Sequence, residues 1–151
     1  MSLTEWFWPN SRARAIDSLA SIASRYALLA DSLKRHAAMC NYPTLRSGLE
    51  QLALFEAEQA QTLQSFLQRE GRAAQAAAPS PPGASANNWQ RLNADLTLHG
   101  ELLRELNQVI VLLEGREHHA EAWLRDFAAR EERSLGDLRD LTLKCDPQAL
   151  D

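Results

Sequence analysis

Two glutamates occupy equivalent places in two segments of the chain where helical periodicity predicts apolar side chains. Glu56 and Gln59 interrupt the apolar stripe of a helix predicted over residues 44–70. Glu131 and Ser134 interrupt a second stripe in the same way, 75 residues further along the chain. A carboxylate that faces a helical core is costly unless it is paired, hydrogen-bonded or bound to a metal ion. These four residues therefore indicate either a buried polar network or a metal site.

Both stripes keep the alternating spacing of four and three residues that puts side chains on one face of a helix. The first stripe consists of Leu45, Leu49, Leu52, Glu56, Gln59, Leu63 and Phe66. The second consists of Ala120, Leu124, Phe127, Glu131, Ser134, Leu138 and Leu141. An offset of 73 residues also aligns the stripes of two other predicted helices and pairs Tyr26 with His99. The chain is therefore predicted to contain two similar helical hairpins related by internal duplication.

Four helices are needed to position these residues. They are predicted at about residues 11–40, 44–70 and 89–113, and from a break at 114–116 to about residue 144. The breaks between the first two and the last two helices are so short that each pair must be antiparallel. Pro43 suits the first turn of a helix, and Gly115 suits the left-handed residue that follows a helix end. The chain is predicted to be one domain, residues 1–151, with hairpins at about 11–70 and 89–145.

The segment at about residues 71–88 is rich in Ala, Pro, Ser and Gly and is the predicted crossover between the hairpins. A helix of about 27 residues is ~40 Å long, and an extended proline-containing segment of this size reaches ~50 Å. The crossover can therefore span the bundle and leave the second and third helices parallel. We predict an all-α four-helix bundle of ferritin-like topology with one long crossover. The alternative is a loop between neighbouring ends in simple up-down order.

Counting residues outward from the two predicted turns puts the polar residues of the four helices at the same height in the bundle. Two of them lie fifteen residues from the first turn, and two lie about sixteen from the second. The predicted layer contains Tyr26, Glu56, His99 and Glu131, with Gln59 and Ser134 one turn away. Two acids that face each other in a core require a compensating interaction.

The segments Glu56-Ala57-Glu58-Gln59 and Glu131-Glu132-Arg133-Ser134 resemble the Glu-x-x-His motifs of the ferritin-like superfamily, in particular its rubrerythrin-like branch. The resemblance implies a di-iron or di-manganese site, completed by a glutamate from each of the first and third helices, that reduces peroxide or oxidises and stores iron. Only the two glutamates match the motif. Gln59 and Ser134 replace both histidines, and Tyr26 stands near the place of the first helix's glutamate. The third helix offers His99, with Asp95 and Glu101 nearby.

Three interpretations of this layer stay open. In the first, it is a metal-free polar core held together by hydrogen bonds among its six residues. In the second, Glu56, Glu131 and His99 bind one ion of iron, manganese or zinc, with Tyr26, Gln59 and Ser134 around them. In the third, it is a di-metal redox centre in which Glu101 or Asp95 and a water supply the missing ligands.

Composition restricts the classes of partner. The net charge of −4 over 151 residues argues against a nucleic-acid-binding protein, which normally presents a basic face. The sequence has no apolar run long enough for a membrane span and no charged-then-apolar leader, so a cytoplasmic protein is expected. Cys40 and Cys145 are expected to be free thiols there. His36, His118 and His119 are expected at the surface.

The opening residues Trp6, Phe7 and Trp8 precede the predicted start of the first helix, which Asn10 or Ser11 can cap. They are interpreted either as a plug over one end of the bundle or as a surface for a protein partner or a second copy of the chain.

The sequence favours a non-catalytic binding or assembly protein without a cofactor, because both motif histidines are replaced. The alternative is a metal-dependent oxidoreductase resembling rubrerythrins, because the two glutamates keep the same register in both hairpins.

Overall fold

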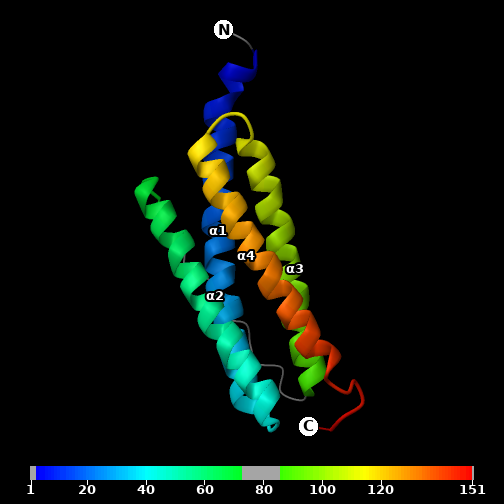
Figure 1. The fold of residues 1–151 in the computed structure, drawn as a ribbon. Helices are drawn as coiled ribbons and strands as arrows, with labels where there is room; N and C mark the ends of the chain where they lie inside the picture. The colour runs from blue at the N-terminus through cyan, green and yellow to red at the C-terminus, as the bar shows by residue number, and fades with distance from the viewer. Residues whose placement is uncertain (1–2, 73–85, 151) are drawn as a thin grey trace.

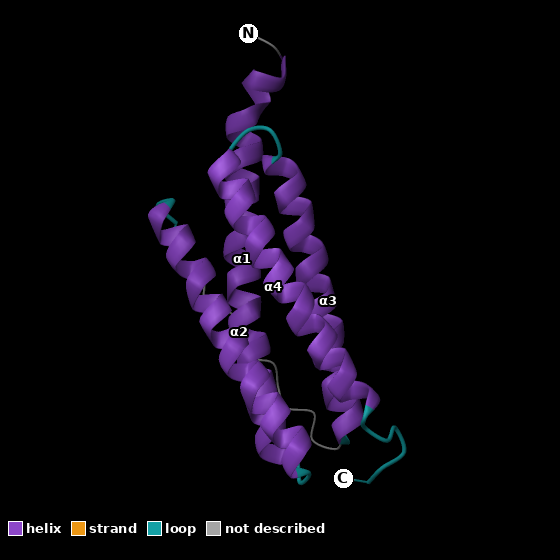
Figure 2. Cartoon of the chain, viewed as in Figure 1, coloured by secondary structure: helices purple, strands orange, loops and turns teal. Residues whose placement is uncertain are grey.

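The computed structural model describes residues 3–72 and 86–150, with side chains from Pro9 onward. It contains four helices, which agree with the predicted ones within two residues except at the start of the first (Figures 1 and 2). They are α1 (Leu3–Met39), α2 (Pro43–Arg69), α3 (Asn88–Leu113) and α4 (His118–Leu143). The chain is thus an all-α four-helix bundle, as the sequence predicts.

The order of the helices around the bundle follows from their contacts. α1 packs against α2 and α3, and α4 packs against α3 and α2, so that α2 and α3 lie on a diagonal. These two diagonal helices run in the same direction, and each of the four neighbouring pairs is antiparallel (Figure 1). The predicted topology, with parallel second and third helices, is confirmed. Residues 73–85, which make up most of the predicted crossover, lie outside the described residues.

The prediction for the start of the first helix is wrong. α1 begins at Leu3 and contains Pro9, instead of beginning after Asn10. A proline inside a helix removes a single backbone hydrogen bond, and here the residues on both sides of it keep helical conformation. The first turns of α1 extend beyond the turn that joins α3 to α4 (Figure 1).

The two hairpin turns follow from a few local residues. Tyr42 is extended, as expected before a proline, and Pro43 is the first residue of α2. The Arg46 side chain donates hydrogen bonds to the carbonyl oxygens of Ala37 and Cys40, at 3.2 and 3.0 Å, and so caps the end of α1. Gly115 has a φ of 72° and ends the α3 side of the second turn, as predicted.

The start of α3 is fixed by a capping box. The Asn87 side chain accepts a hydrogen bond from the backbone of Gln90, and the Gln90 side chain accepts one from the backbone of Asn87. The Asn87 amide also donates to the carbonyl oxygens of Pro147 and Ala149, at 2.9 and 3.0 Å. The segment after α4 is therefore fastened to the start of α3.

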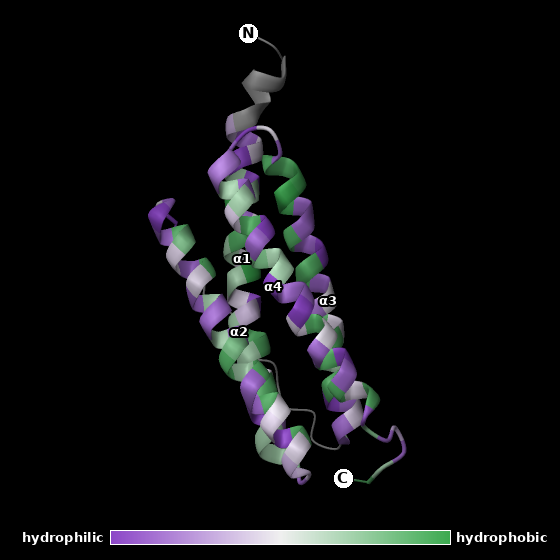
Figure 3. Cartoon of the chain, in the orientation of Figure 1, coloured by the Kyte–Doolittle hydropathy of each residue, from purple (hydrophilic) through white to green (hydrophobic). Residues whose placement is uncertain are grey.

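Apolar and polar residues alternate around each helix (Figure 3), and the predicted stripes supply the core. Leucines of all four helices are fully buried, including Leu19, Leu49, Leu63, Leu92, Leu106, Leu124 and Leu138. Polar residues interrupt this core at mid-bundle. Across residues 3–72 and 86–150, no helix combines the length and apolar character that crossing a membrane requires.

Candidate functional site

Each helix contributes one large polar side chain to the middle of the bundle. Tyr26 comes from α1, Glu56 from α2, His99 from α3 and Glu131 from α4, and the exposed fraction of each is 0%. The structure therefore brings together the four residues that the sequence places in one layer. Their burial follows from the helical periodicity, because each stands where a core residue belongs.

The imidazole of His99 lies between the two carboxylates. Its Nε2 atom is 3.0 Å from Glu56 Oε1 and 3.4 Å from Glu131 Oε2. One ligand atom from each of these three residues lies within 4.8 Å of the other two. Two carboxylates and one imidazole thus face a common point inside the bundle.

The residues that replace the motif histidines hold the carboxylates in place. The Ser134 hydroxyl donates to Glu56 Oε1 at 2.5 Å and lies 3.3 Å from His99 Nε2. The Gln59 amide donates to Glu131 Oε1 at 3.0 Å. Each carboxylate therefore has one oxygen fixed by a neighbouring helix, which reduces its freedom to turn away from His99.

Several buried polar atoms of the cluster have no hydrogen-bond partner among the described residues. They are Glu56 Oε2, Glu131 Oε2, His99 Nδ1 and the Tyr26 hydroxyl oxygen. Glu131 Oε2 has the ion-pair contact with His99 at 3.4 Å, which is too long and too poorly directed to satisfy it fully. Buried polar atoms in folded proteins almost always have a partner. Two of these atoms are carboxylate oxygens, the donors that a metal cation prefers.

The protonation of Glu131 follows from its surroundings. The pKa of Glu131 is raised to about 9, first by burial and then by the charge of Glu56 and a hydrogen bond with its carboxyl group, while the hydrogen bond from Gln59 opposes the rise. Burial also raises the pKa of Tyr26, and the negative charges of Glu131 and Glu56 add to that shift. At neutral pH the cluster therefore favours either a proton on Glu131 or a cation between the carboxylates.

Aromatic packing holds the imidazole from the α1 side. The Tyr26 ring meets the His99 ring edge-on, with centroids 6.1 Å apart and planes at 87°. It also meets Phe127 of α4 at 5.8 Å. These contacts restrict the rotation of His99 and keep the Tyr26 phenol beside the carboxylates.

The described residues do not fit the di-metal centre that the resemblance implies. Asp95 is buried but turns away from the cluster, because it accepts hydrogen bonds from Ser32 of α1 at 2.6 Å and from His36 at 2.5 Å. Glu101 is exposed. Three ligand residues remain, Glu56, Glu131 and His99, and this set suits a single ion.

One polar contact was missed by sequence reasoning. His36 is half-buried and binds Asp95, whereas the sequence predicts it at the surface. The signal was Asp95 itself, which lies one turn before His99 on a buried face and requires a partner. Ser32 and His36 of α1 thus both contact Asp95 of α3.

Other predicted positions lie apart from the cluster. His118 and His119 are exposed, as predicted. Cys40 and Cys145 form no disulfide, and the ends of α1 and α4 next to them lie at the same end of the bundle (Figure 1). The side chains of Trp6, Phe7 and Trp8 lie outside the described part of the structure.

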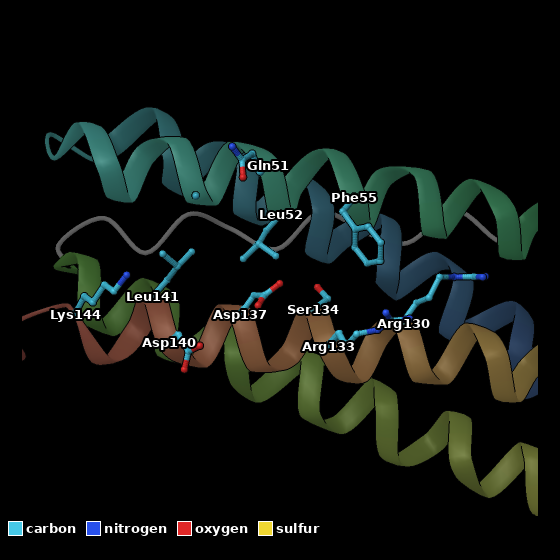
Figure 4. Close-up of a pocket in the computed structure, with 11 residues that line it drawn as sticks. Gln51, Leu52, Phe55, Arg130, Arg133, Ser134, Asp137, Asp140, Leu141 and Lys144 are labelled. Atoms are coloured by element: carbon cyan, nitrogen blue, oxygen red, sulfur yellow. The ribbon is translucent and has the colours of Figure 1, made fainter.

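A groove runs between α2 and α4 along one side of the cluster (Figure 4). Its volume is about 600 Å³, and Ser134 forms part of its wall. In Figure 4, Ser134 and Asp137 of α4 face Leu52 and Phe55 of α2. The groove thus reaches a side chain that touches both Glu56 and His99.

The chain matches no protein-family model and no curated protein. A function must therefore be inferred from the contacts of Glu56, His99 and Glu131 themselves.

Proposed function

We propose that the protein binds one divalent transition-metal ion, iron, manganese or zinc, through Glu56, Glu131 and His99. The observation that carries this proposal is the convergence of one ligand atom from each residue, all within 4.8 Å, in a fully buried place. Two carboxylates and one imidazole form a donor set that these metals accept. Glu56 Oε2 and Glu131 Oε2 accept no hydrogen bond by distance and angle among the described residues, which leaves them available as donor atoms to an ion.

Electrostatics support a cation at this point. Two buried carboxylates close together cannot both keep their charge without a compensating positive charge. A proton within the cluster is one way to remove the repulsion, and a bound divalent ion is another. Ion binding in a preformed buried site also stabilises the folded chain, because the unfolded chain does not present the ligands together.

The surrounding residues have supporting roles in this proposal. Ser134 and Gln59 orient the two carboxylates by donating to one oxygen of each. Tyr26 keeps its proton on the hydroxyl oxygen, because its pKa is raised, and offers it as a donor beside the carboxylates. A bound ion would supply Lewis-acid or redox chemistry here.

The bundle topology and the positions of Glu56 and Glu131 support membership of the ferritin-like superfamily, and their equal register supports an origin by duplication of one hairpin. We do not extend this inference to the di-metal peroxide or iron-oxidation chemistry of the rubrerythrin-like branch. Gln59 and Ser134 offer no imidazole, and Asp95 is engaged with Ser32 and His36. The proposed site is therefore a simpler form of that metal centre, which binds one ion instead of two.

A non-catalytic binding or assembly protein is the second candidate, and a specific surface favours it. A groove of about 800 Å³ between α1 and α2 is lined largely by alanines, among them Ala27, Ala30, Ala53 and Ala57. Leu54 at this groove has an exposed fraction of 69%. In this case the polar layer is a structural network, and a protein partner or a second copy of the chain covers the groove.

The test is metal analysis of matched variants. Protein purified without chelator, and protein reconstituted anaerobically with Fe²⁺, Mn²⁺ or Zn²⁺, is analysed by plasma mass spectrometry. We expect about one ion per chain in the wild type, loss of binding in Glu56→Gln, and wild-type binding in Glu58→Gln. Glu58 is the matched control, since it is an exposed glutamate of the same helix. No saturable binding by the wild type after reconstitution would contradict the proposal and favour the second candidate.

A further inference from the structure

The four helix pairs do not pack equally well around the cluster. α1 and α2 pack most closely, whereas α2 and α4 pack least closely of the adjacent pairs. The groove of about 600 Å³ lies along this weakest pair (Figure 4). Its α2 wall includes Leu52 and Phe55, and its α4 wall includes Ser134 and Asp137.

Ser134 connects this groove to the cluster. It is 4% exposed, lines the groove, and touches the two residues at the cluster's centre, Glu56 Oε1 at 2.5 Å and His99 Nε2 at 3.3 Å. One small side chain therefore separates the groove from two of the three ligand residues. A serine hydroxyl leaves a gap when it rotates, because its side chain has a single heavy atom beyond Cβ.

The cluster is closed on the side of α1. Tyr26 and Phe127 are fully buried and pack edge to face there. None of the six residues of the cluster lines the groove between α1 and α2. None of them lines a second hollow, on α3 near Gly100. Of these hollows, the α2/α4 groove is the one that a residue of the cluster, Ser134, lines.

Side chains of both charges line the groove, which has two acids, Asp137 and Asp140, and three basic residues. Asp137 lies three residues after Ser134, on the same face of α4, and its carboxylate points into the groove beside the Ser134 hydroxyl (Figure 4). Arg130, Arg133 and Lys144 also border the groove, and Arg130 is held by Asp126 at 2.5 Å. The acid that neighbours the inner end of the groove is therefore Asp137.

We infer that metal ions reach Glu56, His99 and Glu131 along the α2/α4 groove, with Asp137 as the first oxygen contact and Ser134 as the gate. This inference rests on the proposed metal site. An ion held at Asp137 needs the Ser134 hydroxyl to release Glu56 Oε1, after which that oxygen can turn to the ion. The route thus predicts that groove residues govern the rate of uptake, while the three ligands govern affinity.

Co²⁺ binding experiments separate the rate of metal uptake from the affinity for the metal. Apo protein is mixed with Co²⁺ in a stopped-flow instrument, and binding is followed by the visible absorption of the bound ion; equilibrium titration gives the Kd. Asp137→Trp fills the groove with an indole and removes the carboxylate. Its matched control is Glu132→Trp, because Glu132 is an exposed acid of the same helix outside the groove lining. We expect Asp137→Trp to slow uptake at least tenfold with a Kd within threefold of wild type, and Glu132→Trp to take up Co²⁺ at the wild-type rate.

A second pair of variants approaches the groove from α2. Gln51→Trp narrows the groove, and Gln61→Trp places the same side chain at the groove on the other side of α2. If Asp137→Trp does not fold, as judged by circular dichroism and Tm, this pair carries the test with the same expected contrast. If a folded groove variant and its folded control take up Co²⁺ at the same rate, the proposed route is wrong, but the proposed metal site still stands. A wild-type chain that binds no Co²⁺ overturns the metal site and the route together.

Discussion

Glu131 illustrates how a single buried carboxyl group controls stability in the absence of an ion. Burial, together with the neighbouring Glu56, raises its pKa from the ordinary value of 4.5 to about 9. Between these two values the unfolded chain releases a proton that the folded chain keeps. The contribution of Glu131 to stability is therefore fully present below about pH 4.5 and declines as the pH rises towards 9.

The first prediction concerns this decline. In the presence of a chelator, the unfolding free energy of the wild type is expected to fall between pH 5 and 9, with a slope of at most ~1.4 kcal/mol per pH unit from this group. Glu131→Gln keeps the shape of the side chain but cannot ionise, so it should flatten the slope and be more stable than wild type at pH 8. Urea unfolding at several pH values measures both effects. An unchanged slope in Glu131→Gln would show that another group is responsible.

The second residue-scale prediction uses the two positions that lack imidazole. Gln59 already contacts Glu131, Ser134 already contacts Glu56 and His99, and the groove beside Ser134 has room for a larger side chain. The double substitution Gln59→His, Ser134→His adds two donors to the three present. We expect it to bind metal at least tenfold more tightly than wild type, or to bind a second ion, as measured by calorimetric titration and metal analysis. A lower affinity in a folded double variant would place the ion away from these two side chains.

At the scale of elements, Arg12 ties three segments together at one end of the bundle. Its guanidinium reaches from α1 to Glu70 at the end of α2, at 2.5 Å, and to Glu117 before α4, at 2.6 Å. The Glu117 hydrogen bond is the first cause of the raised pKa of Arg12, and the two carboxylates both contribute to the rise. The two hairpins are thereby joined by side chains as well as by the crossover.

The element-scale prediction is a modest, salt-sensitive loss of stability. All three side chains are about one-third exposed, so solvent weakens the pairs. Arg12→Ala is expected to lower the unfolding free energy by about 0.5–1 kcal/mol, and the loss should shrink in 1 M NaCl. The exposed neighbour Arg14 provides the control, because Arg14→Ala should change stability less. Thermal unfolding at low and high salt measures this loss of stability. A loss that does not depend on salt would indicate that the aliphatic part of the Arg12 side chain stabilises the fold by packing.

At the scale of the whole molecule, periodicity predicted most of the architecture. The apolar stripes that contain Glu56 and Glu131 predicted the buried faces of α2 and α4, and the length of the crossover favoured the direction that α3 takes over simple up-down order. Counting residues from the turns near Asn41 and Gly115 placed Tyr26 and His99 at the height of the glutamates. These inferences succeed because a helix has a constant rise and a constant angle per residue.

Other features depend on interactions that periodicity does not describe. The start of α1 depends on whether the chain stays helical through Pro9, which a local rule about proline does not decide. The pairing of His36 with Asp95 depends on the rotation of α1 against α3. The groove beside Ser134 depends on how closely α2 approaches α4, which no spacing along one helix encodes.

The arrangement of the helices also implies an approximate two-fold axis. It runs perpendicular to the helices, through the middle of the bundle, and exchanges α1 with α3 and α2 with α4. This operation interchanges Glu56 with Glu131, so both carboxylates are equivalent about the axis. It also interchanges Tyr26 with His99, which are chemically different. The symmetry is therefore broken at this pair and at Gln59 and Ser134, and in the proposed site an ion bound by both glutamates and His99 would lie off the axis, towards α3.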